Sequence, residues 1–516
     1  MSISQITEKM SRYRWTIVAM LFMATTVNYL DRQVLSLTWK DFIAPEFHWT
    51  DSDYGTITAW FSAFYAISLL FAGRFVDWMD TKKGFMWAIG IWSLGAVLHA
   101  FCGIATSGVL TGHWFVGFAE AREHIDQFVK TTGDIARVLN VSVVLFIFAR
   151  LVLAIGEAGN FPAAIKTTAE YFPKKDRAYA TSIFNAGATV GALAAPVTIP
   201  LLAKHFGWEA AFIVIGGLGF VWMGWWQFGY NKPDKHPKVN KAELDYINQD
   251  DDDPDAGKTD EEIAEKGKKM SMVQLLKYKQ TWAFAFGKFM TDGVWWFYLF
   301  WTPAYLSSVY GMESSDTAAQ LALFVLYAIT LLSIIGGWLP TYFVDSKGMH
   351  PYAGRMKSML IFAFFPLLAV FAQPLGHLTY WFPVIIIGIA GAAHQAWSAN
   401  IFTTVSDMFP KAAVATVTGI GGLAGGAGSV LINKGSGLLF DFSRGSTMYK
   451  GLEVPMSREM LAEGAEFVRQ PLNVMGFVGI EAGYFVIFGV CAVAYLIGWV
   501  VMKALVPKYK AITDLA

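Results

Sequence analysis

Charged residues stand inside hydrophobic stretches of this chain, where they could bind an anion or carry a proton. The first stretch, Trp15–Leu37, contains Asp31 beside Arg32. A charged side chain costs roughly 2.5–3.5 kcal/mol in a membrane-spanning helix unless it faces a partner or a water-filled cavity. The pair therefore either snorkels to the interface at the end of its helix or belongs to a buried polar site.

A later hydrophobic stretch carries Arg150 and Glu157. Seven residues are close to two helical turns, so both side chains project from one helix face. At comparable depth, Asp31 with Arg150 and Arg32 with Glu157 are reasonable partners, and the four charges sum to zero. They are either static bridges between helices or a coupled site. In the coupled site, an anion that takes the arginine leaves a carboxylate without its partner, and that carboxylate then tends to bind a proton.

The second half of the chain carries Lys288 and Asp292 at i and i+4 on one helix face. The aromatic run Trp295–Tyr298 follows. An aromatic surface beside a polar pair suits a sugar-like ligand, with the charges fixing its carboxylate. The alternative is a self-satisfied pair followed by an interfacial aromatic belt.

Hydrogen-bonding residues gather in one further apolar stretch, which contains His394, Gln395 and Ser398. So many polar groups in an apolar helix predict that they line a cavity. Together with Tyr29, Tyr65 and Asn185, Gln395 and Ser398 are candidates for binding sugar hydroxyls.

The composition is that of a polytopic membrane protein. Of 516 residues, 55% are hydrophobic and only 16% charged, against roughly 25% charged in soluble domains. The formal net charge is zero, so no attraction to nucleic acid is expected. Cys102 and Cys491 lie in apolar runs and predict neither a disulfide framework nor a metal site. No nucleophile–base pair or cofactor motif is visible, so we expect no cofactor and no enzyme activity.

Hydropathy predicts an all-α membrane protein with twelve transmembrane helices. The expected spans are Trp15–Leu37, Tyr54–Trp78, Gly84–Ala105, Val141–Ala164, Ala178–Ala203, Glu209–Tyr230, Thr281–Val309, Ala318–Val344, Met356–Gln373, Leu378–Phe402, Ala413–Phe440 and Met475–Val501.

A polar stretch divides these spans into two sets of six. We expect an N-terminal bundle over 1–230, a linker over 231–280 and a C-terminal bundle over 281–516. The linker contains the acidic cluster Asp250–Asp253, and its best helix candidate is Lys241–Ile247. Two loops are unusually long, 106–140 and 443–473. Either could hold a short helix on the rim of the protein, and the first could instead hide a re-entrant segment.

Basic residues set the expected orientation, because short cytoplasmic loops are rich in Lys and Arg. They follow the second, fourth and eighth spans, whereas the loops after the seventh and ninth spans have none. The even-numbered loops are therefore predicted to be cytoplasmic, as are both termini, and the long loops lie on the exterior side.

A short motif after the second span carries a family resemblance. Gly73, Asp77, Lys82 and Lys83 resemble the loop motif of the major facilitator superfamily, although Asp80 stands where that motif usually has glycine. A weaker counterpart after the eighth span includes Asp345 and Arg355, as expected for two related halves. The resemblance implies two pseudo-symmetric six-helix bundles around a central site.

Within that superfamily the chain resembles the anion:cation symporter family. The matching motifs are Tyr29–Arg32, Arg150–Glu157 with the following Ala-Gly-Asn-Phe-Pro, Glu170–Pro173 and Lys241–Ile247. The resemblance implies proton-driven import of an organic anion. Arg32 would bind the substrate carboxylate, Asp31 and Glu157 would be protonatable, and Arg150 would be their partner.

Residues in the second half are most similar to those of hexuronate transporters, namely Ala393–Ala396 and the spacing of Lys288 and Asp292. We therefore expect Lys288 and His394 to assist substrate binding and Asp292 to assist proton coupling. The expected partners are a small organic anion, protons and the lipid bilayer, and we expect a monomer in a bacterial inner membrane. An aldonate transporter, a uniporter or exchanger, and a non-transporting sensor remain open alternatives.

Overall fold

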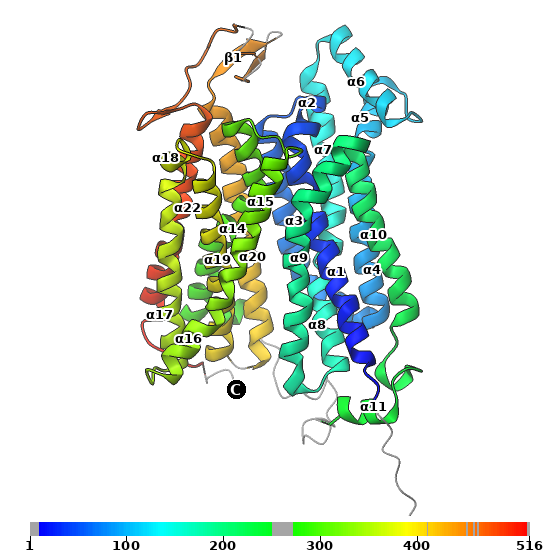
Figure 1. Cartoon of the computed structure of the whole chain (residues 1–516), viewed down its shortest axis with the longest axis vertical. Helices are drawn as coiled ribbons and strands as arrows, with labels where there is room; N and C mark the ends of the chain where they lie inside the picture. The colour runs from blue at the N-terminus through cyan, green and yellow to red at the C-terminus, as the bar shows by residue number, and fades with distance from the viewer. Residues whose placement is uncertain are drawn as a thin grey trace, which may run out of the picture.

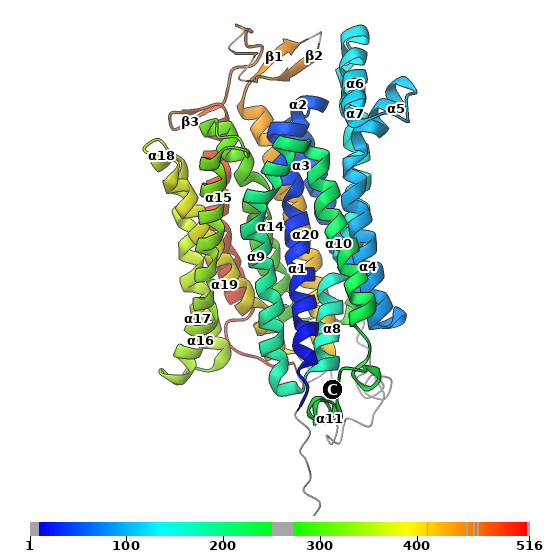
Figure 2. The ribbon, with the colours of Figure 1, turned by 45° about the vertical axis from the view of Figure 1, so that its right-hand side comes forward.

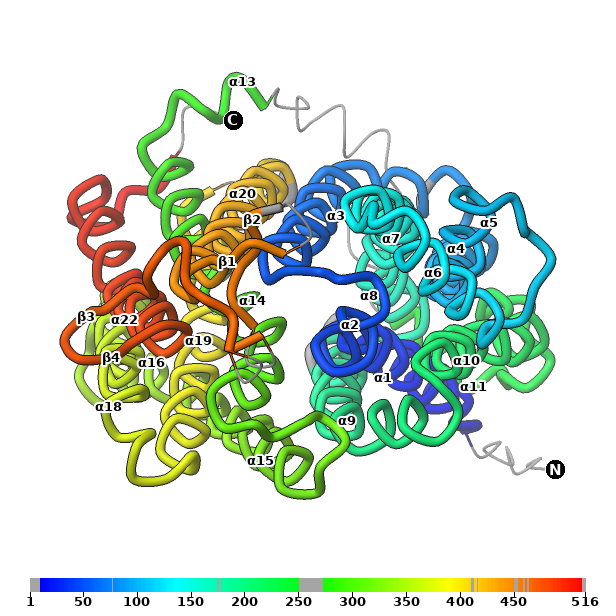
Figure 3. The backbone as a smooth tube through the Cα atoms, turned by 90° about the horizontal axis from the view of Figure 1, so that it is seen from above, coloured from blue at the N-terminus to red at the C-terminus, as the bar shows by residue number. Residues whose placement is uncertain are grey.

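The structure is a computed structural model that describes residues 10–249, 272–409, 411–449, 452–457, 460–461 and 464–512. Its helices form two bundles that stand side by side, one from each half of the chain (Figures 1 and 3). The acidic cluster Asp250–Asp253 of the predicted linker lies outside the described residues.

The first bundle is built by the N-terminal half of the chain. Its elements are α1 (Tyr13–Thr38), η1 (Trp39–Ile43), α2 (Ala44–Phe47), α3 (Asp51–Met79), α4 (Thr81–Ala100), α5 (Cys102–Thr111), α6 (Phe118–Thr132), α7 (Ile135–Glu157), α8 (Asn160–Tyr171), α9 (Lys174–Phe206) and α10 (Trp208–Gly229). Two short helices follow in the linker, η2 (Pro233–Lys235) and α11 (Lys241–Ile247).

The second bundle is built by the C-terminal half. Its helices are α13 (Met272–Leu275), α14 (Lys279–Tyr310), α15 (Thr317–Ile329), η3 (Thr330–Ile334), α16 (Ile335–Asp345), α17 (Pro351–Phe364), η4 (Phe365–Phe371), α18 (Ala372–Gly376), α19 (Trp381–Met408), α20 (Lys411–Ser443) and α22 (Ile480–Leu505). Four short strands join α20 to α22: β1 (Ser446–Tyr449), β2 (Leu452–Pro455), β3 (Asn473–Val474) and β4 (Phe477–Val478).

Each of the twelve predicted spans coincides with a helix or a run of consecutive helices. In the described part of the chain, eight spans are long and apolar enough to cross a membrane, or nine with the bent pair α4 and α5. The other three are α1, α14 and α20. The first two carry charged residues at membrane depth and the third is rich in glycine, which lowers their hydropathy. Buried charge is tolerated there because these helices pack inside protein rather than against lipid.

The first of the two long loops contains a short helix, which is one of the two forms predicted for it. This helix is α6, which stands above the bundle in Figure 1, and α7 already begins at Ile135. The chain therefore bends at Phe101 and folds as helices rather than as a loop between spans. The described residues of the second long loop include four short strands and two helical residues, Met460 and Leu461. The strands form two antiparallel hairpins, with β1 paired to β2 and β3 paired to β4.

These insertions define one end of the molecule. We call the end that carries α6 and the β-hairpins the insertion end, and the opposite end, which carries the chain termini and α11, the linker end (Figures 1 and 2). α1 runs from the linker end to the insertion end. Within the first bundle α9 packs closely on α1, because a Cβ atom at Gly187 or Gly191 would lie 2.4 Å from a backbone oxygen of α1.

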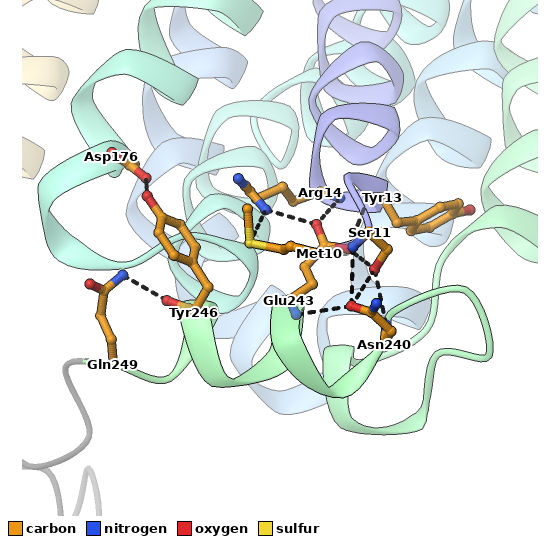
Figure 4. A network of polar contacts seen from close by, with 9 residues as sticks. All are labelled: Met10, Ser11, Tyr13, Arg14, Asp176, Asn240, Glu243, Tyr246 and Gln249. Atoms are coloured by element: carbon orange, nitrogen blue, oxygen red, sulfur yellow. Dashed lines mark hydrogen bonds and ion pairs between the residues drawn. The ribbon is translucent and has the colours of Figure 1, made fainter. Parts of the chain in front are cut away.

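The predicted linker helix is present as α11 and is fastened to the first bundle (Figure 4). Glu243 is fully buried and accepts hydrogen bonds from the backbone N–H groups of Tyr13 and Arg14 and from the Arg14 side chain, at 3.0–3.1 Å. The hydroxyl of Ser11 donates to the same carboxylate. This carboxylate therefore satisfies free N–H groups at the start of α1, where negative charge is favoured by the helix dipole.

Candidate functional site

An ion pair buried in the first bundle joins two of the predicted site residues. The guanidinium of Arg32 on α1 donates to Oε2 of Glu157 at the end of α7, with nitrogen–oxygen distances of 3.0 and 3.3 Å. Both residues are 5% exposed or less. The predicted pairing of Arg32 with Glu157 is therefore present. The second oxygen of Glu157 has no hydrogen-bond partner, which leaves an acceptor free beside the arginine.

Three aromatic rings surround the guanidinium of Arg32. Its central carbon lies 5.2 Å from the ring centre of Tyr29, 5.0 Å from that of Tyr65 and 4.9 Å from that of Trp296. Cations are attracted to aromatic faces within about 6 Å. Because Trp296 comes from α14, both bundles contribute to this aromatic box, which we define as Tyr29, Tyr65 and Trp296.

The second predicted pairing is not formed. No ion pair joins Asp31 to Arg150, although both are buried, and Oδ2 of Asp31 and Nε of Arg150 lack hydrogen-bond partners. The Arg150 guanidinium lies instead 5.1 Å from the ring centre of Phe61 on α3. Asp31 nevertheless lies close enough to Arg150 and Glu157 on α7 to interact with both electrostatically. Two unpaired charges thus remain beside one formed pair.

The second bundle contains its own buried ion pair. Nζ of Lys288 lies 2.7 Å from Oδ2 of Asp292 and 4.2 Å from the ring centre of Phe402. Trp296 lies eight residues beyond Lys288 on α14, or about 12 Å along the axis. This pair therefore lies two turns nearer the linker end than the aromatic box. Lys288 and Asp292 are bonded to each other, as the alternative of a self-satisfied pair predicted.

His394 on α19 is held by neighbours from two other helices. It is buried, its Nδ1 lies 2.8 Å from the hydroxyl of Tyr495 on α22, and its ring is parallel to that of Trp295 at 5.3 Å. The aromatic run of α14 is therefore not an interfacial belt. Trp295 contacts His394 and its neighbour Trp296 contacts Arg32, so one helix links the two clusters.

Other predicted residues lie apart from these contacts. Asn185 is exposed on α9, and Gln395 and Ser398 are half-buried on α19. Among the described residues, none of the three forms a hydrogen bond to Arg32 or Glu157. The same stretch of α19 ends at Asn400, which lines a cavity of about 330 Å³ between α16, α17 and α19 at the linker end.

The loop motif lies at the linker end of the first bundle. Nζ of Lys82 donates to Oδ1 of Asn231 at 3.1 Å, and a side chain at Gly73 would meet nothing within 4 Å. Lys83 is exposed, and the side chain of Asp77 lies outside the described residues. In the counterpart motif, Arg355 makes two hydrogen bonds to Asp407 at 2.7 and 3.2 Å.

Sequence reasoning did not identify the contacts between bundles near the insertion end. Asp51 and Arg444 form an ion pair at 2.8 Å across 393 residues, and Trp39, Tyr54 and Trp301 pack together. No local signal marks such pairs, although the charges next to the ends of hydrophobic spans could have drawn attention to Asp51 and Arg444. The described residues contain no group of His, Cys, Asp or Glu that could hold a metal ion.

The fold and the paired bundles are those of a membrane transporter. The sequence profile of the Major Facilitator Superfamily matches residues 21–432, and the chain belongs to that family. The expectation of a transporter rather than an enzyme is thereby confirmed, and so is the predicted fold class.

Individual relatives agree with the resemblance predicted from sequence. The chain is 27% identical over 450 residues to the hexuronate transporter of Escherichia coli K12, covering 86% of this chain and 92% of that protein. It is 26% identical over 335 residues to the galacturonate transporter of Dickeya chrysanthemi, covering 65% and 84%. A bacterial homologue of the human lysosomal transporter Spinster has a similar fold, with a TM-score of 0.62, 18% identity and coverage of 96% and 97%.

Proposed function

We propose that this protein imports a hexuronate, such as glucuronate or galacturonate, together with a proton by alternating access. The observation that carries the proposal is the buried Arg32–Glu157 pair inside an aromatic box drawn from both bundles. A guanidinium binds a carboxylate through two parallel hydrogen bonds, and aromatic faces suit the apolar faces of a sugar ring. The relatives named for hexuronates and galacturonate support the same substrate class.

The ion pair provides a route for coupling. A substrate carboxylate that binds Arg32 competes with Glu157 for the same guanidinium. A buried carboxylate that loses its cation is costly to keep charged and therefore takes up a proton. Release of the substrate restores the pair and expels the proton. Asp31, which has an unpartnered oxygen nearby, is a second proton acceptor in this scheme, and Arg150 balances its charge.

The remaining candidates have secondary roles in this proposal. Lys288 and Asp292 lie on the linker side of the aromatic box, where they would contact substrate on its way out of the site. His394 lies level with the box, against Trp295. Gln395 and Ser398 on α19, and Asn185 on α9, would contact hydroxyl groups once the bundles move. The insertion end faces the exterior and the linker end the cytoplasm, in agreement with the basic residues of the linker-end loops. The membrane is a bacterial inner membrane.

A substrate panel tests this proposal. Purified protein in liposomes is given labelled glucuronate, galacturonate, galactonate, gluconate or galactarate, with and without an inward proton gradient. We expect accumulation of a hexuronate only with the gradient, and its loss in Arg32→Ala together with loss of substrate binding. If the labelled substrate only equilibrates across the membrane, with or without the gradient, the protein is a uniporter. If another acid is preferred, the proposed substrate class is wrong. Retained affinity in Arg32→Ala would exclude the proposed role of Arg32.

A further inference from the structure

Aromatic side chains fill the space between the two bundles on the insertion side of Arg32. Trp39 lies seven residues beyond Arg32, or about 10 Å toward the insertion end. Its ring is parallel to that of Tyr54 on α3 at 4.0 Å, and the edge of Trp301 on α14 meets both rings. All three are fully buried. These three residues contact one another ring to ring, and we call them the aromatic plug.

A buried charge network covers this plug. One carboxylate oxygen of Asp51 accepts a hydrogen bond from Nζ of Lys40, and the other accepts one from Nε of Arg444, both at 2.8 Å. Lys40 belongs to the first bundle and Arg444 follows α20 of the second, and Asp51 is 2% exposed. Arg444 also donates to the hydroxyl of Ser308 at 3.2 Å, so one guanidinium joins α20, α14 and α3.

The second bundle also caps a helix of the first. The two oxygens of Asp441 on α20 accept the backbone N–H groups of Asp51 and Ser52, at 3.0 and 2.8 Å. Free N–H groups at a helix start carry partial positive charge and favour a carboxylate. In most helices that carboxylate comes from the same chain segment. Here it comes from the opposite bundle, so the bond breaks whenever the bundles separate at this end.

Further hydrogen bonds between bundles lie at the same end. Asp41 accepts the hydroxyls of Ser307 and Ser314 at 2.6 and 2.8 Å. Lys434 donates to the hydroxyls of Ser52 and Thr56. Seen from the insertion end, α3 of the first bundle lies beside α20 of the second (Figure 3). The deepest of these bonds joins Ser62 to Ser429 at 2.8 Å, so they extend about halfway through the protein.

We infer that the aromatic plug and the network of Lys40, Asp51, Asp441 and Arg444 form a gate that closes the insertion end of the path to Arg32, with Arg444 as its central residue. The gate opens when the bundles part there, which breaks the Asp51–Arg444 pair and the Asp441 cap together. This inference rests on the alternating-access part of the proposed function, but it assigns the closing residues independently of the substrate. Because only Gly445 separates Arg444 from β1, the β-hairpin insertion is attached closely to the moving part of the gate.

Distances between spin labels test the gate without substrate. One pair, Lys204→Cys with Leu378→Cys, reports on the insertion end, and another, Lys235→Cys with Lys347→Cys, reports on the linker end. All four residues are exposed, whereas Cys102 and Cys491 are buried. In Arg444→Gln we expect the insertion-end distances to lengthen and the linker-end distances to shorten.

The matched control is Arg469→Gln. Arg469 lies at the same end, but it donates to a backbone oxygen of its own bundle, at Phe442, so its removal leaves both distance distributions unchanged. Unchanged distributions in a folded, monodisperse Arg444→Gln protein would overturn the inference. Where Arg444→Gln does not fold, Arg444→Lys retains the charge and produces a smaller shift in the same direction.

A second test opens the gate with a substitution that adds steric bulk between the bundles and leaves the charge unchanged. α3 and α20 touch at Gly437, where an added Cβ atom would lie 2.5 Å from the backbone oxygen of Asp51. Gly437→Ala should therefore push the bundles apart at the insertion end. Gly435→Ala is the matched control, because a Cβ atom at Gly435 on the same helix meets nothing within 4 Å. Equal distances in the two alanine variants would count against the gate, whereas loss of transport with normal gate distances would count only against the proposed function.

Discussion

Arg32 and Trp296 belong to different bundles, yet the guanidinium carbon of Arg32 lies 4.9 Å from the centre of the Trp296 ring. A ligand that binds Arg32 therefore touches the boundary between the bundles, along which they would move in the proposed transport cycle. In an alternating-access transporter this is where binding energy can change the equilibrium between conformations, because a ligand shifts an equilibrium only through contacts that differ between its states.

Trp296 is the residue that the second bundle contributes to the aromatic box, and removing its ring should weaken substrate binding. In Trp296→Leu we expect affinity to fall about tenfold, since a cation–π contact contributes roughly 0.5–2 kcal/mol and a stacking surface for the sugar is lost. Trp282→Leu on the same helix is the control, because Trp282 is 53% exposed and is far from Arg32. Equilibrium binding of labelled hexuronate measures the difference, and equal affinities would remove Trp296 from the site.

Neutralising the carboxylate that pairs with Arg32 should separate binding from coupling. In the proposed scheme Glu157 takes up a proton when substrate displaces it from Arg32. Glu157→Gln cannot do so, and accumulation driven by a proton gradient should therefore fall to background. Exchange of labelled for unlabelled substrate needs no net proton movement and should persist. Asp31→Asn, which removes the carboxylate that has no ion-pair partner, should behave in the same way. Gradient-driven uptake at the normal rate in both variants would exclude the coupling scheme.

The helix pattern could be predicted because a membrane imposes it. Every backbone N–H and C=O must be satisfied inside a segment that crosses lipid, so long apolar runs leave few choices, and even α11 was correctly placed by its local pattern. The Arg32–Glu157 pair followed from helical spacing and charge balance. The same reasoning failed for Asp31 and Arg150, because spacing gives the shared face of one helix but not the rotation of one helix against another.

Contacts between distant segments were beyond prediction. Asp51 and Arg444 each stand at the end of a hydrophobic span, where a charged residue is ordinary, and nothing in the sequence joins them. The β-hairpins after α20 were also missed. Their strands are only two to four residues long, which is too short for an alternating pattern to stand out.

Breaking the α11 network should destabilise the first bundle. Glu243→Ala leaves the side chain of Arg14, which is 7% exposed, without its carboxylate and leaves N–H groups at the start of α1 unsatisfied. Removing one partner of a buried ion pair costs roughly 3–5 kcal/mol, so the unfolding midpoint in detergent should fall markedly. Asp245→Ala on the exposed face of α11 is the control and should leave the midpoint unchanged. A normal midpoint in Glu243→Ala would show that α11 is not needed for the stability of the bundle.

A carboxyl group at the insertion end should make stability depend on pH. The pKa of Glu46 is raised from 4.5 to about 7, chiefly by burial. The hydrogen bond from Trp208 and the charge of Arg122 act to lower it, whereas the nearby charge of Glu209 acts to raise it. The pKa is higher in the folded than in the unfolded protein, so folding is favoured by protonation. The stabilisation is complete below about pH 4.5, falls as pH rises, and is lost above about pH 7, a change of about 3 kcal/mol at most.

Glu46→Gln provides the test, because glutamine stays neutral at every pH and can still accept the hydrogen bond from Trp208. The variant should match the unaltered protein near pH 5 and unfold at a higher temperature at pH 8, where the buried carboxylate is charged in the unaltered protein. Glu123→Gln, at an exposed position on α6, is the control and should leave the unfolding temperature unchanged both near pH 5 and at pH 8. An identical dependence of the unfolding midpoint on pH in Glu46→Gln and the unaltered protein would show that Glu46 does not titrate in this range.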